Sequence, residues 1–315
     1  KSNQAHRELQ KICTANIKNE AGKCVYTHML NPDGGIETDL TVVCIEKDHF
    51  RIISSAATRE RDKFHINKHL PKDVELKDVT DDYCVFGVFG PKSRALMKSI
   101  SKDNFENDNF RFSTAKYITI EGIKIWTQRL SFVGELGYEL YVKSKDAKKI
   151  YELLISKGKD FNLSNCGMHA MDIMRMESGF LHWGHDISPE ENQYQAGLSF
   201  TISSKKEDEF IGKKALEKIK KEKIKSRFAM FTLSDSKPGE PLLLHDEPIY
   251  LENKIIGRST SGNYSFNFRK NLTFGYINND ISNDELHKKD LFIEIEKKKY
   301  PIELINKPLK QTNFK

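Results

Sequence analysis

Acidic side chains inside otherwise apolar segments are the first feature of this sequence that could do chemistry. Asp39 lies in residues 36–45 (IETDLTVVCI), a strand-like segment that is rich in apolar and β-branched side chains. A carboxylate in the interior of a strand costs free energy unless water or a bound group contacts it. Asp39 is therefore either a functional carboxylate or a side chain that faces water on an open sheet.

A second candidate is the segment at residues 131–140 (SFVGELGYEL), in which Glu135 and Glu139 flank a turn punctuated by glycine. Phe132 and Tyr138 lie beside these carboxylates. A glutamate can accept two N–H bonds from one edge of a flat heterocycle such as a 2-aminopyrimidinone, while an aromatic ring covers the face of that heterocycle. An ordinary hairpin with a charged tip explains the same residues equally well.

Two histidine pairs could bind a metal, but neither has a complete set of ligands. His182 and His185 lie beside Asp186, and the spacing of His65 and His69 can place both on one helical face. Neither pair has a neighbouring Cys or Glu that completes a zinc set, and the HExxH pattern is missing. We therefore predict structural or surface histidines and no metal site. The patterns GxGxxG, GxxxxGKS/T and GxSxG are also missing, so nucleotide-phosphate binding and serine hydrolysis lack their usual supports.

The elements that must position these residues follow an α+β order. The sequence NPDGG at residues 31–35 predicts a turn, because proline fixes φ and glycine can take a positive φ. Strand, strand and helix follow one another twice, with Pro91 at the first position of one helix. We predict two related strand–strand–helix sub-domains with antiparallel sheets. The expected strands are 24–30, 36–45, 49–55, 74–79, 83–89, 117–120, 123–131 and 138–142, and the expected helices are 58–70, one opened by Pro91, 146–157 and 169–178.

The composition changes after Ser203, where a second type of domain is expected. Residues 210–225 are rich in lysine and predict a helical linker. Short strands separated by regularly spaced turns follow, which indicates an all-β barrel or sandwich of about 90 residues. We place the first domain at residues 1–205, the linker at 206–226 and the last domain at 227–315. The expected strands of the last domain are 228–233, 248–251, 254–260, 272–277, 291–295 and 300–304.

The overall composition excludes several classes of protein. The 315 residues are 38% hydrophobic and 30% charged, values typical of a globular chain and not of a collagen-like or disordered one. No apolar run approaches the ~20 residues that a membrane-spanning helix needs, so no membrane partner is expected. Five scattered cysteines form no CxxC pair, and the chain opens on no secretory or transit segment. A reducing compartment and a cytoplasmic location are expected.

The net charge of +6 does not by itself indicate nucleic-acid binding. The chain has 40 Lys and 11 Arg, whereas nucleic-acid readers rely on arginine and on clustered basic faces. The densest basic cluster, residues 213–225, is interrupted by Glu217 and Glu222 and is typical of a solvated helix face. We expect no nucleic-acid partner, and the charge suits a small anionic ligand. The chain starts at Lys1 close to a helical pattern at residues 8–12, which we interpret as part of a longer polypeptide.

Several segments, taken in order, resemble the folate-binding aminomethyltransferase family, which includes the glycine cleavage T protein. The segments SFVGELGYEL and HWGHDI are more similar to the tetrahydrofolate-binding half of dimethylglycine and sarcosine dehydrogenases than to the T protein itself. The resemblance runs through nearly the whole chain. The segments that carry it are YTHMLNPDGGIETDLTV, RLSFVGELGYEL, MDIMRMESGFLHWGHDI, AGLSF, FIGKKAL, GRSTSGNYSFNF, LTFGYI and YPIEL.

The resemblance implies roles for individual side chains. Asp39 matches the catalytic aspartate that orients the folate, and Glu139 matches the glutamate that holds the pterin ring. Phe132 falls where the T protein has a tyrosine, so ring stacking is kept and the hydroxyl contact is lost. We expect Asp39, Glu139 and Phe132 on neighbouring strands, and the folate between the α+β half and the barrel. The other side chains that the resemblance places in the folate site are Arg175, Ile53 and Glu135.

Three departures from the family's pattern argue against T-protein activity and leave folate binding intact. Met171 stands where the T protein has another arginine, and Gln193 and Gln195 replace its Pro and Glu. The resemblance implies one-carbon transfer to tetrahydrofolate from a small methylated amine of the dimethylglycine or sarcosine type, or from an aminomethyl carrier. FAD would belong to an upstream partner domain outside these residues.

Two alternatives to this function stay open at this point. One is a stand-alone folate-dependent demethylase that acts directly on a methylated sulfur or nitrogen compound. The other is a non-catalytic folate-binding protein of the kind that assists iron–sulfur enzymes. The hallmark Lys-Gly-Cys segment of the second class is absent here, because SFVGELGYE occupies that region.

Overall fold

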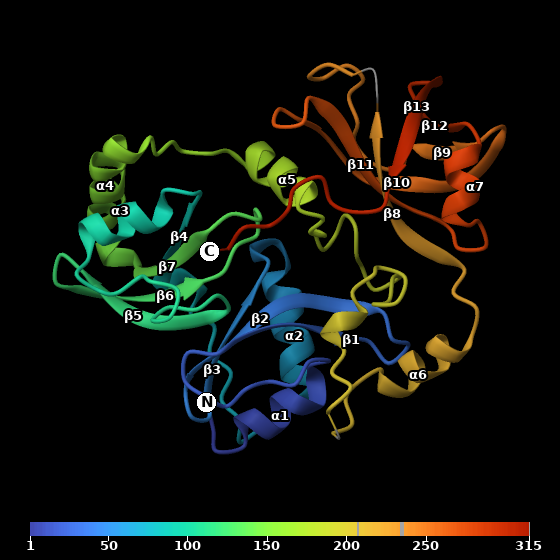
Figure 1. Cartoon of the computed structure of the whole chain (residues 1–315). Helices are drawn as coiled ribbons and strands as arrows, with labels where there is room; N and C mark the ends of the chain where they lie inside the picture. Colours follow the sequence, from blue (N-terminus) through green and yellow to red (C-terminus); the bar gives the residue numbers. More distant parts are fainter. Residues whose placement is uncertain (207, 234–235, 315) are drawn as a thin grey trace.

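Three sheets organise the chain in its computed structural model, which describes residues 1–206, 208–233 and 236–314. A three-stranded sheet and a four-stranded sheet form the N-terminal half, and six strands form a closed barrel in the C-terminal part (Figure 1). The predicted α+β half with two sub-domains and the all-β barrel are confirmed. Among the described residues, no helix is both long enough and apolar enough to cross a bilayer.

The first sub-domain is an antiparallel sheet with two helices on one face. Its elements are α1 (Ala5–Ile12), β1 (Cys24–Leu30), β2 (Ile36–Glu46), β3 (His49–Ser54), the 3-10 helix η1 (Ala56–Thr58) and α2 (Arg59–His69). Asn31 closes the predicted turn between β1 and β2, where its Oδ1 accepts hydrogen bonds from the N–H groups of Asp33 and Gly35. Alternate strand residues, among them Leu40 and Val42, pack against α1 and α2 in one apolar cluster.

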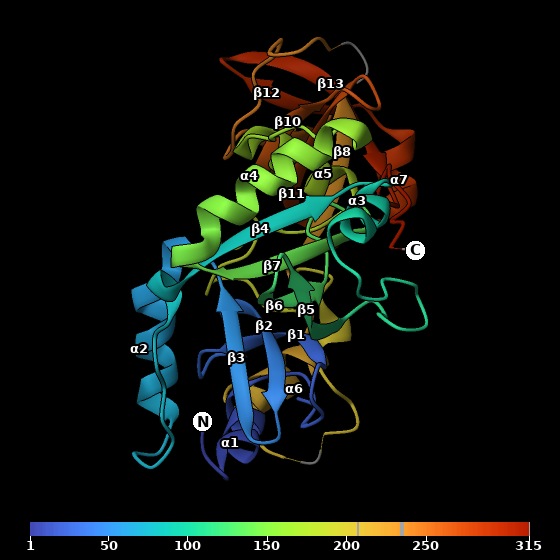
Figure 2. The ribbon, with the colours of Figure 1, turned by 90° about the vertical axis from the view of Figure 1, so that its left-hand side faces the viewer.

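The second sub-domain repeats this order around a four-stranded sheet. Its elements are η2 (Thr80–Asp82), β4 (Tyr83–Phe89), α3 (Ser93–Ile100), β5 (Thr114–Ile120), β6 (Ile123–Arg129), β7 (Gly137–Lys143), η3 (Ser144–Asp146), α4 (Ala147–Gly158) and η4 (Lys159–Phe161). The strands are ordered β4-β7-β6-β5. Tyr138 and Leu140 of β7 pack against α3 and α4 in a second apolar cluster, and Figure 2 shows α4 on the side of this sheet that is turned away from β1–β3.

Two local predictions were wrong, and one short helix was missed. Residues 74–79 form no strand, because the segment is tied to α2 by side chains: Asp78 accepts a hydrogen bond from Arg59 Nε at 2.7 Å. Pro91 lies before its helix and not at its first position, since α3 starts at Ser93. A short helix that was not predicted, α7 (Asn283–Lys288), is capped at its first turn by Ser282.

The C-terminal barrel closes in the order β10-β11-β8-β13-β12-β9. Its strands are β8 (Ser226–Leu233), β9 (Pro248–Leu251), β10 (Lys254–Ser265), β11 (Lys270–Asn278), β12 (Leu291–Ile295) and β13 (Lys298–Ile305). Side chains such as Phe231, Ile249 and Ile293 fill the interior.

Before the barrel come α5 (Met168–Glu177), η5 (Ser199–Thr201) and α6 (Lys213–Lys221). Only Leu216 is buried within α6, so the lysine-rich segment is the solvated helix that was predicted.

The two sheets of the α+β half meet through the faces that their helices leave uncovered. Cys24 and Val43 of the first sheet share an apolar cluster with Ala115, Trp126 and Tyr141 of the second sheet. We call these surfaces the two inner faces. Because strand residues alternate between faces, the residues two positions away and their cross-strand partners also belong to the inner faces. This juxtaposition brings side chains about a hundred residues apart in sequence into one region.

Candidate functional site

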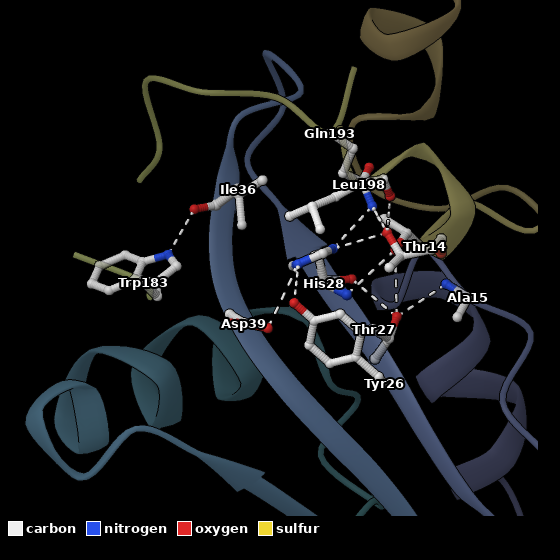
Figure 3. Close-up of polar contacts among 11 residues, drawn as sticks. Thr14, Ala15, Tyr26, Thr27, His28, Ile36, Asp39, Trp183, Gln193 and Leu198 are labelled. Atoms are coloured by element: carbon white, nitrogen blue, oxygen red, sulfur yellow. Dashed lines mark hydrogen bonds and ion pairs between the residues drawn. The ribbon is translucent and has the colours of Figure 1, made fainter. Parts of the chain in front are cut away.

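Asp39 lies in the middle of β2 on the inner face of the first sheet. Its cross-strand partner is His28 of β1, and the His28 Nε2 atom is 3.6 Å from Asp39 Oδ1 (Figure 3). The Asp39 side chain is only 16% exposed, and its Oδ1 has no hydrogen-bond partner among the described residues. Burial raises the pKa of this carboxyl from 3.8 to about 7. The alternative in which Asp39 faces open water on a sheet surface therefore fails, and the functional interpretation gains support.

His28 is the hub of a buried polar network behind Asp39. The ring is 0% exposed, and burial lowers its pKa to about 3, so the imidazole is neutral at neutral pH. Its Nδ1 contacts Thr201 Oγ1 at 3.0 Å and Gln193 Nε2 at 3.1 Å, and its Nε2 contacts the Tyr26 hydroxyl at 3.2 Å (Figure 3). A neutral histidine supplies no counter-charge to Asp39, which leaves that carboxylate able to attract a cationic ligand.

Gln193 was noted in the sequence only as a departure from the family's pattern. Its Nε2 also donates to Thr201 Oγ1 at 2.7 Å and contacts Thr14 Oγ1 at 3.1 Å. The Gln193 amide thus connects the segment before η5 to His28 of β1, behind Asp39. Sequence reasoning missed His28 itself, because a lone histidine inside a strand carries no motif.

Glu139 lies in β7 on the inner face of the second sheet. It is in register with Gln128 of β6 on one side and with Gly87 of β4 on the other. The Tyr141 hydroxyl donates to its Oε2 at 2.9 Å, and burial raises the pKa of the carboxyl above its usual value. The negative charge of Glu139 also helps burial to raise the pKa of the Cys24 thiol in the first sheet. Glu139 therefore faces the first sheet.

Gln128 is a residue that sequence reasoning did not single out. Its side chain is 0% exposed, and neither its Oε1 nor its Nε2 has a partner among the described residues. Trp126, two residues earlier on the same face, also has an unpartnered indole N–H within the described chain. Unpaired buried polar atoms are uncommon in proteins, and an ordered water, an ion or a ligand usually satisfies them.

Three further predicted site residues have different surroundings. Ile53 of β3 is the cross-strand partner of Thr41 and packs against the cluster between the inner faces. Phe132 is partly exposed and stacks on Phe180, with ring centroids 6.3 Å apart. Glu135 forms an ion pair with Lys310 at 2.5 Å, so its carboxylate already has a cationic partner.

Arg175 is buried, with 1% of its side chain exposed, and holds α5 against the barrel. Its guanidinium donates to Asp172, to the carbonyl oxygen of Phe180, to Asp186 and to Ser261 Oγ of β10. These contacts use the Nε and both terminal nitrogens. The geometry favours a positioning role for Arg175, and its direct contact with folate stays a prediction.

The structure corrects the expected placement of the principal carboxylates. Asp39 and Glu139 are not on neighbouring strands of one sheet, because β2 and β7 belong to different sheets. They come from the two inner faces, to which Ile53 also contributes. Sequence periodicity could not have shown this arrangement, since it depends on which uncovered faces pack together.

The histidine pairs show no metal geometry. His182 and His185 stack on each other with ring centroids 4.7 Å apart, and burial lowers the pKa of His182. His65 and His69 lie on one side of α2 with centroids 4.9 Å apart. In the described part of the chain, no group of three or more His, Cys, Asp or Glu side chains could hold a metal ion.

Comparison with known proteins identifies the family. Residues 2–206 match the family model of the GCVT N-terminal domain, and residues 227–310 match the glycine cleavage T-protein C-terminal barrel domain. This chain belongs to the glycine cleavage T-protein family. The resemblance expected from the sequence is confirmed. The solved structure of glycine cleavage system aminomethyltransferase T from Bartonella henselae shares the fold, with a TM-score of 0.83 and 20% identity over 98% of this chain and 82% of that one.

Relatives in the glycine cleavage T-protein family differ in how much of their length this chain spans. Human mitochondrial dimethylglycine dehydrogenase is 32% identical over 94% of this chain, and 4-methylaminobutanoate oxidase (formaldehyde-forming) of Paenarthrobacter nicotinovorans is 37% identical over 81%. The chain spans 34% and 31% of the lengths of these two proteins. Aminomethyltransferase of Halothermothrix orenii is 32% identical over 88% of this chain and 76% of its own length.

Proposed function

We propose that this chain binds tetrahydrofolate between its two inner faces and passes to it a one-carbon unit from a small N-methylated amine. The observation that carries the proposal is that Asp39 and Glu139 lie on the inner faces of two sheets that pack together, while neither Asp39 Oδ1 nor the Gln128 amide beside Glu139 has a hydrogen-bond partner among the described residues. Family membership supports a transferase that uses folate. Tyr26, on the same face as Asp39, keeps 39% of its surface exposed at the edge of this face.

The inner-face residues fit a flat heterocycle that presents N–H groups. Glu139 would accept from the 2-amino and ring N–H groups of a pterin, because an ionised carboxylate offers two acceptor oxygens side by side. Ile53 would contact the apolar part of the ring from the first sheet. Phe132 would cover the ring or its benzoyl extension at the edge of the site. Glu135 and Arg175 are already paired within the protein and would act by holding the surrounding segments in place.

Asp39 would be the catalytic residue. Bound tetrahydrofolate supplies two nucleophilic nitrogens that take up a methylene group from an iminium donor. Transfer of that group from the methylene iminium ion to the two folate N–H groups releases the neutral secondary amine and one proton, and Asp39 would accept this proton. The ionised form of Asp39 would also stabilise the positive charge of the incoming donor, since the neutral His28 behind it offers no competing cation. A carboxyl with a pKa of about 7 suits this proton transfer near neutral pH.

Most of the rate enhancement would come from holding the two reactants together. Correct orientation of two bound reactants can lower a barrier by about 7–11 kcal/mol. Sheltering between the sheets would also limit hydrolysis of the donor to formaldehyde. The donor class follows from relatives whose names contain dimethylglycine and 4-methylaminobutanoate. Oxidation of such an amine to the iminium would need an FAD-carrying partner or domain outside these residues, which would take up two electrons.

The reaction can be tested without that partner. Sarcosine mixed with ¹³C-formaldehyde gives the methylene iminium at equilibrium, and rapid quenching then measures labelled methylene-tetrahydrofolate after addition of the chain and tetrahydrofolate. The proposal predicts that the chain accelerates formation above the uncatalysed rate, and that the acceleration depends on sarcosine. Absence of any acceleration, with the chain shown to be folded, would contradict transferase activity.

One relative favours a second candidate function. The 37% identical 4-methylaminobutanoate oxidase is named as formaldehyde-forming. In that case the site would bind the iminium and release its carbon as formaldehyde, with water as the acceptor. Dilution of the equilibrated mixture separates the two functions, because this alternative predicts that the chain speeds the release of free formaldehyde from the iminium after dilution and gives no gain in labelled methylene-tetrahydrofolate.

A further inference from the structure

Gln128 is a buried amide of which neither polar atom has a hydrogen-bond partner among the described residues. Its amide is 0% exposed, yet its Oε1 and Nε2 both lack partners in the described part of the chain. An unpaired buried amide destabilises the folded chain, because it has lost its hydrogen bonds to water and gained none in return. Gln10 offers a contrast, since it is also buried but donates to Asn16 Oδ1 at 2.9 Å and accepts from the Ile17 N–H at 3.2 Å.

The register of the second sheet places Gln128 in one row with Glu139. The row crosses the sheet from Ala115 of β5 through Gln128 and Glu139 to Gly87 of β4. Small residues flank the two polar ones, and the Phe89 ring fills the position that a side chain at Gly87 would occupy. The row belongs to the inner face, because Trp126, two residues before Gln128, lies in the cluster that joins the sheets.

The two side chains in this row offer a defined order of hydrogen-bonding groups. An ionised Glu139 presents two acceptors, and the neighbouring amide presents a donor at Nε2 and an acceptor at Oε1. The edge of a 4-oxopterin presents, in order, the 2-amino donor, the N3–H donor and the C4 carbonyl acceptor. Two acceptors followed by one donor complement this order.

We infer that Gln128 is a specificity-determining residue that donates from Nε2 to the C4 carbonyl of the pterin, next to the N–H groups held by Glu139. The inference rests on the proposed function and extends it, because it names the group that selects a 4-oxo ring over a ring with a different substituent at that carbon. It also gives the unpaired amide a function: binding of the ring would supply the hydrogen bond that Gln128 lacks in the ligand-free chain.

Binding of two ring analogues to matched variants tests this role. Calorimetry should compare tetrahydrofolate with its 2,4-diamino counterpart, in which an amino donor replaces the C4 carbonyl and N3 carries no hydrogen, a loss that affects the wild type and the Gln128 variants alike. In Gln128→Glu a second carboxylate faces C4, so the Kd of the 4-oxo ring should rise about tenfold to a hundredfold. The Kd of the 4-amino ring should rise less, so the variant should prefer the 4-amino ring more than the wild type does. Glu139 is unchanged in this comparison, so the change in ratio isolates position 128.

Stability without ligand gives a second readout that an ordinary structural glutamine would not produce. Gln128→Leu removes two unpaired polar atoms from a buried site, so the Tm of the ligand-free chain should rise while tetrahydrofolate affinity falls. The control Gln10→Leu removes satisfied hydrogen bonds, so its Tm should fall and the Kd ratio of the two rings should stay at the wild-type value.

The outcomes separate this inference from the proposed function. Wild-type chain that binds no tetrahydrofolate would overturn both. The role of Gln128 alone would be overturned if the wild type binds and Glu139→Gln weakens that binding, but Gln128→Glu leaves the Kd ratio unchanged and Gln128→Leu leaves the affinity unchanged. Loss of 4-oxo affinity in both Gln128 variants, with the shifted ratio in Gln128→Glu, is the result that supports it.

Discussion

His28 and Asp39 face each other across β1 and β2, with Nε2 of the histidine 3.6 Å from Oδ1 of the aspartate. The contact is unusual because it is not an ordinary ion pair. Burial keeps His28 neutral and at the same time raises the pKa of Asp39 to about 7. The carboxyl can therefore exchange a proton near neutral pH beside a neutral imidazole that the network behind it holds in place.

The pH dependence of one-carbon transfer should report the ionisation of Asp39. The reactive form is the carboxylate, so the single-turnover rate should rise with pH through about 7 and level off above it. His28, whose pKa is about 3, does not titrate in this range. Single-turnover rates between pH 5.5 and 8.5 check this expectation. A rate that is flat across the range would remove Asp39 from the proton transfer.

Asp39→Asn should separate chemistry from binding. The variant keeps the shape of the side chain but removes its charge and its ability to accept a proton, so turnover should fall by more than folate affinity. Loss of one preorganised electrostatic group typically costs about 10²–10³ in rate. The measurement is the Kd for tetrahydrofolate beside the single-turnover rate. An Asp39→Asn variant that transfers carbon at the wild-type rate would make Asp39 a structural strand residue.

The junction between α5 and the barrel should depend on Arg175. Arg175→Met leaves the carboxylate of Asp186, which is 0% exposed, without its guanidinium partner. Breaking a buried pair in this way costs about 3–5 kcal/mol, so the free energy of unfolding and the Tm should fall clearly. The control is Lys218→Met, which removes an exposed pair with Glu222 and should change stability little. Equal stability of the two variants would show that the buried pair does not hold the domains together.

The stacked pair His182 and His185 should bind no metal. The described residues around it provide no third ligand, and stacked rings do not converge on one point. Elemental analysis of the purified chain should find no stoichiometric zinc, and His185→Ala should leave the metal content unchanged. Stoichiometric zinc that is lost on His185→Ala would contradict this expectation.

The sequence predicted the elements well where local patterns determine them. The turn at Asn31, the strand around Asp39 and the lysine-rich helix follow from residue types within a few positions. Residues 74–79 were predicted wrongly as a strand, since Asp78 instead pairs with Arg59 of α2, a contact between segments that the local sequence does not show.

The site was only partly predictable, for a physical reason. Asp39 could be found because a carboxylate inside an apolar strand needs an explanation, and Glu139 gained its role from a family resemblance. Gln128 and His28 carry no sequence signal, since their importance depends on burial and on partners that are present or missing. The meeting of the inner faces is a tertiary feature, and no local pattern encodes which uncovered faces pack together.

Calorimetric titration of tetrahydrofolate into wild-type chain and Glu139→Gln tests the central claim most directly. Glu139→Gln replaces two acceptors by one acceptor and one donor, which leaves a buried mismatch with the N–H groups of the pterin and costs about 1–3 kcal/mol. The account predicts stoichiometric binding to the wild type and affinity about tenfold to a hundredfold weaker in Glu139→Gln, with the Tm of the ligand-free chains showing that both are folded. Equal affinity of the two proteins, or no heat of binding with folded wild-type chain, would contradict a folate site between the inner faces.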